Sequence, residues 1–399
     1  MRSSAKTRWG VVAIAILAGI VASMQVGKVP PAIGVIRTDL ALGLVTAGWV
    51  VSLFNAIGGF GGAAVGMVAD RIGVRRMVLA GLALLFVGSV AGGLAGDARG
   101  LLLARTIEGV GFLSVAVAIP AIILAVTASD KQRLVLAGWS CYMPIGMALM
   151  MLAAPTLIAA FDWRGLWLLN AGLLAAFAPA FAWATRGVNP TPHGKLSFAD
   201  IKATVNRPGP WLLAASFAFY TVQWFGLLSW LPTFLAEDLG FDSGDAAYWT
   251  AAIVASNAVG NITGGLLLQR GVPRWRILCV AALALGIFGA GVFQPAIGSD
   301  LKLILAFGFS IVGGALPGVV MAGAPFHSIA PTTIGATNGM ILQGSNGGIL
   351  IGPPVVAAIV TGTGHWQATS WVMLGAGLAG ATIAVILRRV EKQIAAEKV

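Results

Sequence analysis

Charge is scarce in this sequence: only 10% of its 399 residues are Asp, Glu, Lys or Arg, while 58% are hydrophobic. The mean hydropathy of +0.90 lies far above the range of soluble proteins and excludes a water-soluble globular domain. Cysteine is almost missing too. The two cysteines, Cys141 and Cys279, lie in separate apolar runs and support neither a disulfide framework nor a metal site. No P-loop occurs, which argues against a protein that hydrolyses ATP.

Long apolar runs fill most of the chain instead. They are continuous and lack the two-residue alternation of a barrel strand, and helices satisfy every backbone polar group in hydrocarbon. We therefore predict an all-α integral membrane protein with twelve transmembrane helices in two six-helix pseudo-repeats. The approximate cores of these spans are 9–28, 44–69, 77–95, 100–126, 134–160, 165–185, 210–235, 246–268, 277–295, 302–326, 335–360 and 368–387.

Basic residues gather between alternate spans, which sets the expected orientation. With both termini in the cytoplasm, most of the 25 basic residues fall inside, and the outer loops hold mainly acidic ones such as Asp39, Asp97, Glu237 and Asp300. This is the distribution of a multi-pass plasma (inner) membrane protein, and it explains the pI of 10.4 without a nucleic-acid partner.

A polar stretch rich in Pro, Gly and charge interrupts the spans after the sixth. It predicts an N-terminal six-helix bundle over residues 1–185, a cytoplasmic linker over 186–209, and a C-terminal six-helix bundle with a short cytoplasmic tail over 210–399. The pattern Gly66-x-x-x-Asp70-Arg71 before the third span returns as Gly265-x-x-x-Gln269-Arg270 before the ninth, half the chain length later. This repetition indicates an internal duplication.

The stretch Gly66-x-x-x-Asp70-Arg71-x-Gly73-x-Arg75-Arg76, between the second and third of twelve helices, resembles the signature loop of the major facilitator superfamily. Arg105-Thr-Ile-Glu-Gly109-Val-Gly111 in the fourth span is similar to the arginine motif of that family. The resemblance implies a secondary transporter, with no enzymatic activity, cofactor or metal, that works by alternating access. Residues 219–235 of the seventh span also resemble the cyanate/2-nitroimidazole transporter group.

Two interpretations of the signature loop stay open. In the first, Gly66 allows close helix packing, Gly73 allows a tight reversal, and Asp70 with Arg71 forms a latch. The resemblance implies that Asp70 contacts the amino end of the eleventh helix in the outward-open state, where a carboxylate is favoured. In the second, the arginines only enforce orientation; Arg75 and Arg76 are expected to act as anchors in the headgroup region in either case.

Charged residues within spans are costly and usually face a cavity or a partner. Arg105 and Glu108 lie three residues apart on one helix face, so they either neutralise each other or serve transport, Arg105 by attracting an anion and Glu108 by exchanging protons. Lys28 is expected to reach the outer interface, or else to line the cavity as an anion site. His327, at a helix end, is expected to be solvated.

Neutral polar residues supply the remaining candidates for substrate contact. Gln223 and Trp224 in the seventh span are the leading ones, and Tyr142, Tyr220 and Asn338 complete the set. Each could instead join two helices by a hydrogen bond that has no part in transport.

The preferred function is transport of a small anion or polar solute, with protons as a further partner. The protein is expected to be a monomer in the lipid bilayer. The alternatives are a proton-driven efflux pump for drugs or other small molecules, and a membrane sensor that does not transport. The fifth span lacks the Gly-Pro-x-x-Gly-Gly run of the family's drug exporters, which argues against the first alternative.

Overall fold

The computed structural model describes residues 7–59, 72–188, 198–330 and 333–397, and within these ranges it contains helices and no strand. Two prolines set the first break. Pro30 and Pro31 follow directly after Val29, lack the N–H groups that a continuing helix needs, and are tolerated in the first turn of a new one. The first span therefore divides at Lys28 into α1 (Trp9–Gly27) and α2 (Val29–Asp39).

Most of the other helices follow the predicted apolar runs, whereas α9 lies within the predicted linker 186–209. Those before residue 189 are α3 (Leu44–Ser52), η1 (Leu53–Asn55), α5 (Val74–Gly93), α6 (Ala98–Val126), α7 (Gln132–Ser140) and α8 (Tyr142–Ala184). Those after residue 197 are α9 (Phe198–Val205), α10 (Pro208–Leu228), α11 (Leu231–Glu237), α12 (Ser243–Gln269), α13 (Arg274–Val292), α14 (Ser299–Met321), α15 (Ala324–His327), α16 (Ile334–Thr363), η3 (Trp366–Ala368) and α17 (Thr369–Glu397).

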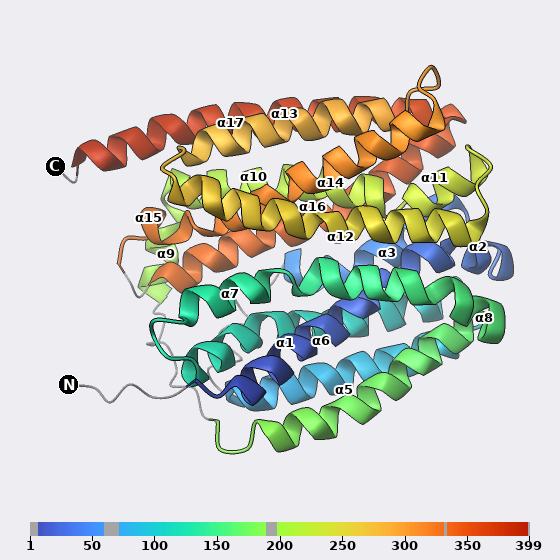
Figure 1. Ribbon diagram of the computed structural model, residues 1–399, viewed down its shortest axis with the longest axis horizontal. Coiled ribbons are helices and arrows are strands. Elements are labelled where there is room, and N and C mark those ends of the chain that lie inside the picture. The colour runs from blue at the N-terminus through green and yellow to red at the C-terminus, as the bar shows by residue number, and fades with distance from the viewer. Residues whose placement is uncertain (1–6, 60–71, 189–197, 331–332, 398–399) are drawn as a thin grey trace.

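Ten helical stretches among the described residues are long and apolar enough to cross a membrane. One of them, Leu134–Ala184, has 51 residues and reverses at Asp162, whose φ of 62° breaks the helical geometry of α8 (Figure 1). It covers both the fifth and sixth predicted spans. The second predicted span begins with α3 and runs into residues outside the described ranges. The all-α membrane fold is thus confirmed, and the count of twelve spans stays a prediction.

The same packing pattern occurs twice along the chain. In the first half α1 packs on α8, α5 on α6, and α5 on α8; in the second half α10 packs on α16, α13 on α14, and α13 on α17. Figure 1 shows the first set below the second. The two halves meet mainly where α3 packs on α16, α8 on α12, and α2 on α11.

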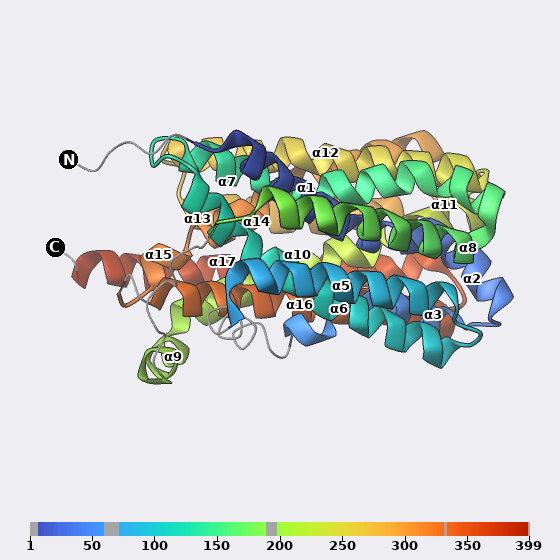
Figure 2. The ribbon, with the colours of Figure 1, turned by 90° about the horizontal axis from the view of Figure 1, so that it is seen from below.

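The ends of the helices define two ends of the molecule. Helix α1 begins and α17 ends at the same end, and α2, α11 and the reversal in α8 lie at the opposite one (Figures 1 and 2). Small residues allow the helices to approach closely where they cross. On α14, for example, Gly314 lies against the backbone of Asn257 on α12, with no room for a Cβ atom.

Candidate functional site

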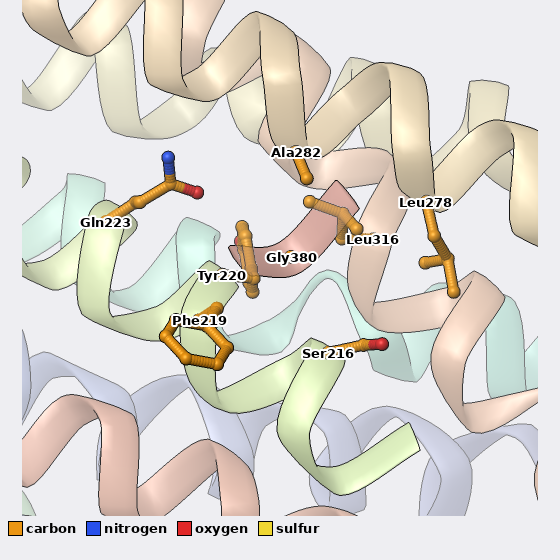
Figure 3. A pocket seen from close by; sticks show the side chains of 8 residues that line it. All are labelled: Ser216, Phe219, Tyr220, Gln223, Leu278, Ala282, Leu316 and Gly380. Atoms are coloured by element: carbon orange, nitrogen blue, oxygen red, sulfur yellow. The ribbon is translucent and has the colours of Figure 1, made fainter. Parts of the chain in front are cut away.

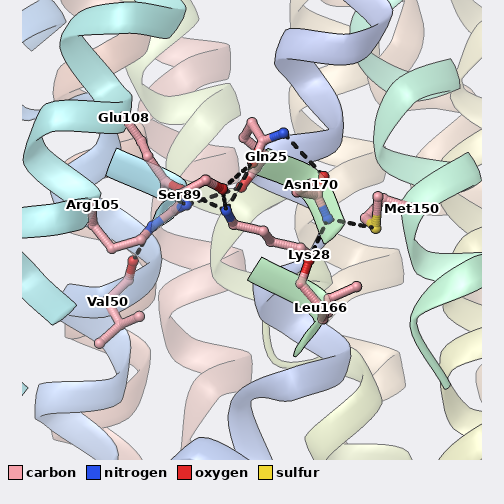
Figure 4. Close-up of polar contacts among 9 residues, drawn as sticks. All are labelled: Gln25, Lys28, Val50, Ser89, Arg105, Glu108, Met150, Leu166 and Asn170. Atoms are coloured by element: carbon pink, nitrogen blue, oxygen red, sulfur yellow. Dashed lines mark hydrogen bonds and ion pairs between the residues drawn. The ribbon is translucent and has the colours of Figure 1, made fainter. Parts of the chain in front are cut away.

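Lys28 lies at the break between α1 and α2, and its side chain is fully buried. The expectation that it reaches the outer interface is wrong. Its ammonium group donates to three oxygens: Glu108 Oε1 at 2.6 Å, Ser89 Oγ at 2.7 Å and Gln25 Oε1 at 2.8 Å (Figure 4). These three acceptors match its three N–H donors, so the group can stay charged without water.

Glu108 on α6 binds two cations at once. Its Oε1 accepts from Lys28, and its Oε2 accepts from Arg105 Nη1 at 2.5 Å. All three side chains have an exposed fraction of 0%. The predicted contact between Arg105 and Glu108 is therefore present, but it belongs to a buried cluster of Lys28, Arg105 and Glu108, which we call the charge triad.

Polar side chains from three other places hold the triad. Gln25 Oε1 also accepts from Ser89 Oγ at 3.1 Å, and Gln25 Nε2 donates to Asn170 Oδ1 at 3.0 Å. Asn170 Nδ2 in turn donates to the Leu166 carbonyl at 2.9 Å within α8. Helices α1, α5, α6 and α8 thus share one hydrogen-bond network (Figure 4). Such a network fixes the positions of the charges it surrounds.

The Arg105 guanidinium is only partly satisfied. Its Nε donates to the Val50 carbonyl at 3.1 Å, and its Nη1 also donates to the Gln25 carbonyl at 3.0 Å. Its Nη2 is buried and has no hydrogen-bond partner in the described part of the chain. The guanidinium carbon lies 4.4 Å from the centre of the Phe54 ring, whose face attracts cations.

The triad carries one more positive than negative charge, because two cations share one carboxylate. Charges removed from water need compensation, and an unpaired buried donor costs about 1–3 kcal/mol. The face of the Trp167 ring, whose centre is 4.5 Å from the ammonium nitrogen, compensates part of the charge of Lys28. The surplus charge and the free Nη2 of Arg105 together make the triad complementary to an anion.

The sequence does not predict Lys28 as a member of this cluster. Spacing on one helix points to Arg105 and Glu108, but Lys28 is 80 residues from Glu108 and shares no local pattern with it. Only the following prolines indicated that the helix breaks there. Ser89 and Asn170, which hold the triad, carried no signal that separates them from other polar residues in spans.

The candidates in the second half bind other helices. Gln223 Nε2 donates to the Met373 carbonyl of α17 at 2.8 Å, and a side-chain hydrogen bond joins Tyr220 to Asn257. Tyr220 and Gln223 line a space between α10, α13, α14 and α17 together with Ser216, Phe219, Leu278, Ala282, Leu316 and Gly380 (Figure 3). This space of about 10 Å³ holds roughly one water molecule, far less than a substrate.

Three further candidates form no hydrogen bond or ion pair with the triad in the described part of the chain. Trp224 is buried against Phe225, and its indole N–H has no partner among the described residues. Tyr142 stacks on Trp139 with ring centres 4.2 Å apart. Asn338 on α16 has an Oδ1 atom without a partner in the described ranges. The structure therefore does not bring the predicted substrate contacts into one set.

Half of the signature loop can be placed. Gly66, Asp70 and Arg71 lie outside the described residues, and Gly73 adopts the left-handed φ of 90° that a glycine tolerates. Arg75 binds the end of α8, donating to the Ala182 carbonyl at 2.6 Å and to Thr185 Oγ1 at 3.1 Å, and Arg76 is exposed. Arg75 therefore caps a helix end, a role that the prediction of an anchor in the headgroup region does not include.

His327 is buried, with an exposed fraction of 2%, so the expectation of a solvated side chain is wrong. Its Nε2 lies 3.3 Å from Glu391 Oε1, and the same carboxylate binds Arg274. Arg274 also donates to the Val319 and Ala322 carbonyls at the end of α14. Arg274 thus caps the end of a helix in the second half, as Arg75 does in the first.

Long apolar helices and a buried charged cluster define a multi-pass membrane protein. The sequence model of the Major Facilitator Superfamily matches residues 15–342, and the chain belongs to that family. The resemblance of the signature loop is confirmed at this level.

Curated relatives are named as transporters. The chain is 23% identical to a probable sulfoacetate transporter of Cupriavidus necator, with 94% of each chain covered. It is 29% identical to a 3-(3-hydroxy-phenyl)propionate transporter of Escherichia coli K12, with 87% of each covered. It is 25% identical to a cis,cis-muconate transport protein of Acinetobacter baylyi, covering 75% of this chain and 80% of the relative. None of the three is named for cyanate, so that subgroup stays a prediction.

Solved structures agree with the fold. A bacterial homologue of the human lysosomal transporter Spinster, inward-facing and unoccupied, superimposes with a TM-score of 0.80 at 16% identity over 99% of both chains. The occupied inward-facing form gives a TM-score of 0.75 at 17% identity, over 96% of this chain and 97% of that one.

Proposed function

We propose that this chain is a secondary transporter of a small organic anion, carrying a carboxylate or a sulfonate, and that it works by alternating access. The observation that carries this proposal is the surplus positive charge of the triad. A buried cluster with one uncompensated cation disfavours a cationic substrate and favours an anionic one.

Arg105 supplies the contact for the anion in this proposal. Its free Nη2 is a buried donor, and a guanidinium presents its N–H groups in a fork that fits a carboxylate or sulfonate. Lys28 and Glu108 hold the guanidinium in place and set its charge balance.

The names of the relatives support the same class of substrate. Sulfoacetate, hydroxyphenylpropionate and muconate differ in size and shape, but each carries at least one carboxylate, and the first adds a sulfonate. What they share is the negative head group, which is the part that a cation such as Arg105 would bind.

In this proposal the bundles of residues 1–185 and 210–399 rock about the linker 186–209. The protein lies in the inner membrane, and both of its termini are in the cytoplasm. One contact supports a state closed at the outer end. Arg37 on α2 and Glu237 on α11, one from each half, form an ion pair of 2.8 Å at the end opposite to the termini. Latching by Asp70 and proton exchange at Glu108 are further parts of the proposal.

Uptake into proteoliposomes tests the function. The purified chain is reconstituted, and uptake of labelled sulfoacetate, an aromatic propionate and muconate is compared with uptake of the corresponding neutral amides, with and without an imposed proton gradient. We expect at least one anion to enter faster than into protein-free liposomes, and its amide not to. Faster uptake of amides or of hydrophobic cations than of every anion would overturn the proposal.

A further inference from the structure

The start of α13 and the end of α17 bring two arginines against one tryptophan. The guanidinium carbon of Arg388 on α17 lies 4.6 Å from the centre of the Trp275 ring, and that of Arg276 on α13 lies 5.5 Å from it. The two helices pack along each other, as Figure 1 shows. Arg389 and Lys392 on α17 are exposed nearby in sequence. We call Trp275, Arg276, Arg388, Arg389 and Lys392 the basic patch.

The charge of the basic patch is not compensated by the protein. The acidic residue within this stretch of α17, Glu391, binds Arg274 and His327 instead. In the described part of the chain no ion pair involves any cation of the patch. Four exposed cations that share no carboxylate therefore repel one another unless an external anion joins them.

An apolar surface continues from the patch along both helices. On α13, the exposed Val280, Leu283 and Ile287 follow Arg276 at helical spacing, so they lie on its face. On α17, Val385 and Leu378 precede Arg389 in the same way and are exposed as well. Cations at one end and an apolar stripe beyond them match a molecule with a charged head and hydrocarbon chains.

We propose that the basic patch binds the phosphate head group of an anionic phospholipid, whose acyl chains lie along the exposed stripes of α13 and α17. Arginine forks fit phosphate oxygens, and tryptophan favours the level of the head groups. A free phosphate would use the cations alone and leave the apolar stripes without a role. The inference is independent of the transported substrate.

Lipid titration of the purified chain in a neutral detergent tests this inference. Phosphatidylglycerol and phosphatidylcholine with identical acyl chains are added, and bound lipid is counted by native mass spectrometry while Tm is recorded. The test variant is Arg276→Gln with Arg388→Gln. The matched control is Arg207→Gln with Arg270→Gln, which removes the same charge from two other exposed arginines.

We expect the wild-type chain and the control to bind phosphatidylglycerol in preference to phosphatidylcholine, and the test variant to bind it about tenfold more weakly or worse. If the lipid-free test variant has a lowered Tm, Arg389→Gln with Lys392→Gln replaces it. Equal loss in the control, an unchanged preference in both patch variants, or equal stabilisation by glycerol phosphate alone would overturn the proposal.

Discussion

Single residues decide the charge balance of the first half, and Glu108 is the group on which it depends. Each of its carboxylate oxygens binds one cation, so Glu108 separates Lys28 from Arg105. Its loss leaves two buried cations without a counter-charge, whereas loss of Lys28 leaves the neutral pair of Arg105 and Glu108. The two substitutions should therefore differ in cost although they break the same contact.

We predict that Glu108→Gln lowers the free energy of unfolding by about 3–5 kcal/mol and that Lys28→Met lowers it by less. Thermal unfolding in detergent measures the difference as a shift of Tm. Glu237→Gln, which breaks an exposed pair, serves as the control and should cost no more than about 1 kcal/mol. A larger loss of Tm in Lys28→Met than in Glu108→Gln would contradict this account of the triad.

The sequence predicts those contacts of the site whose two residues lie close together along the chain. Arg105 and Glu108 meet within one helix turn, so their spacing is sufficient. For Lys28 the sequence leaves two positions open, because nothing local distinguishes a lysine that reaches an interface from one that binds a carboxylate on another helix, and the structure excludes only the outer interface. The burial of His327 is unpredictable for the same reason, since its partner Glu391 is 64 residues away.

Whole helices are positioned by close contacts at small residues, and α14 offers a matched comparison. A Cβ atom at Gly314 would collide with the Asn257 carbonyl of α12, while one at Gly318 would meet nothing within 4 Å. We predict that Gly314→Ala costs about 1–3 kcal/mol of stability and that Gly318→Ala costs nothing or stabilises slightly. Equal Tm values for the two variants would show that this crossing is not closely packed.

At this scale the sequence predicts the fold well, because apolar length and flanking charge are local signals. The predicted core 277–295 corresponds to α13, and 335–360 to α16. The predicted gap between the fifth and sixth spans contains Asp162, and the chain reverses at this residue, whose backbone angles are not helical. Breaks inside spans are not part of these predicted cores, although Pro232 lies in the first turn of α11 just as Pro30 and Pro31 lie in the first turn of α2.

The proposed alternating-access cycle requires contacts between the two halves of the whole molecule to open. Arg37 and Glu237 join α2 to α11 across the halves, with 26% and 49% of their side chains exposed. An exposed pair contributes about 0–1 kcal/mol, so it biases the equilibrium between states without locking it. A bias of that size corresponds to a shift of up to about fivefold in population.

We predict that Arg37→Gln increases the population open at the end that carries α2 and α11. Distances between spin labels on these helices, measured at low salt, report the shift. Arg164→Gln is the matched control, because Arg164 pairs with Asp39 at 2.6 Å within one half. The interpretation fails if Arg164→Gln shifts the distances as much as Arg37→Gln does, or if Arg37→Gln leaves them unchanged.

Counterflow exchange of a labelled organic anion in proteoliposomes, at zero membrane potential, tests the central claim that the charge triad selects an anion. Wild type, Arg105→Lys and Arg105→Gln are compared after their Tm values show that all three are folded. We predict that Arg105→Lys retains exchange with a raised KM, because the charge remains, and that Arg105→Gln exchanges at least about tenfold more slowly. A folded Arg105→Gln variant that exchanges the anion at the wild-type rate would contradict the account.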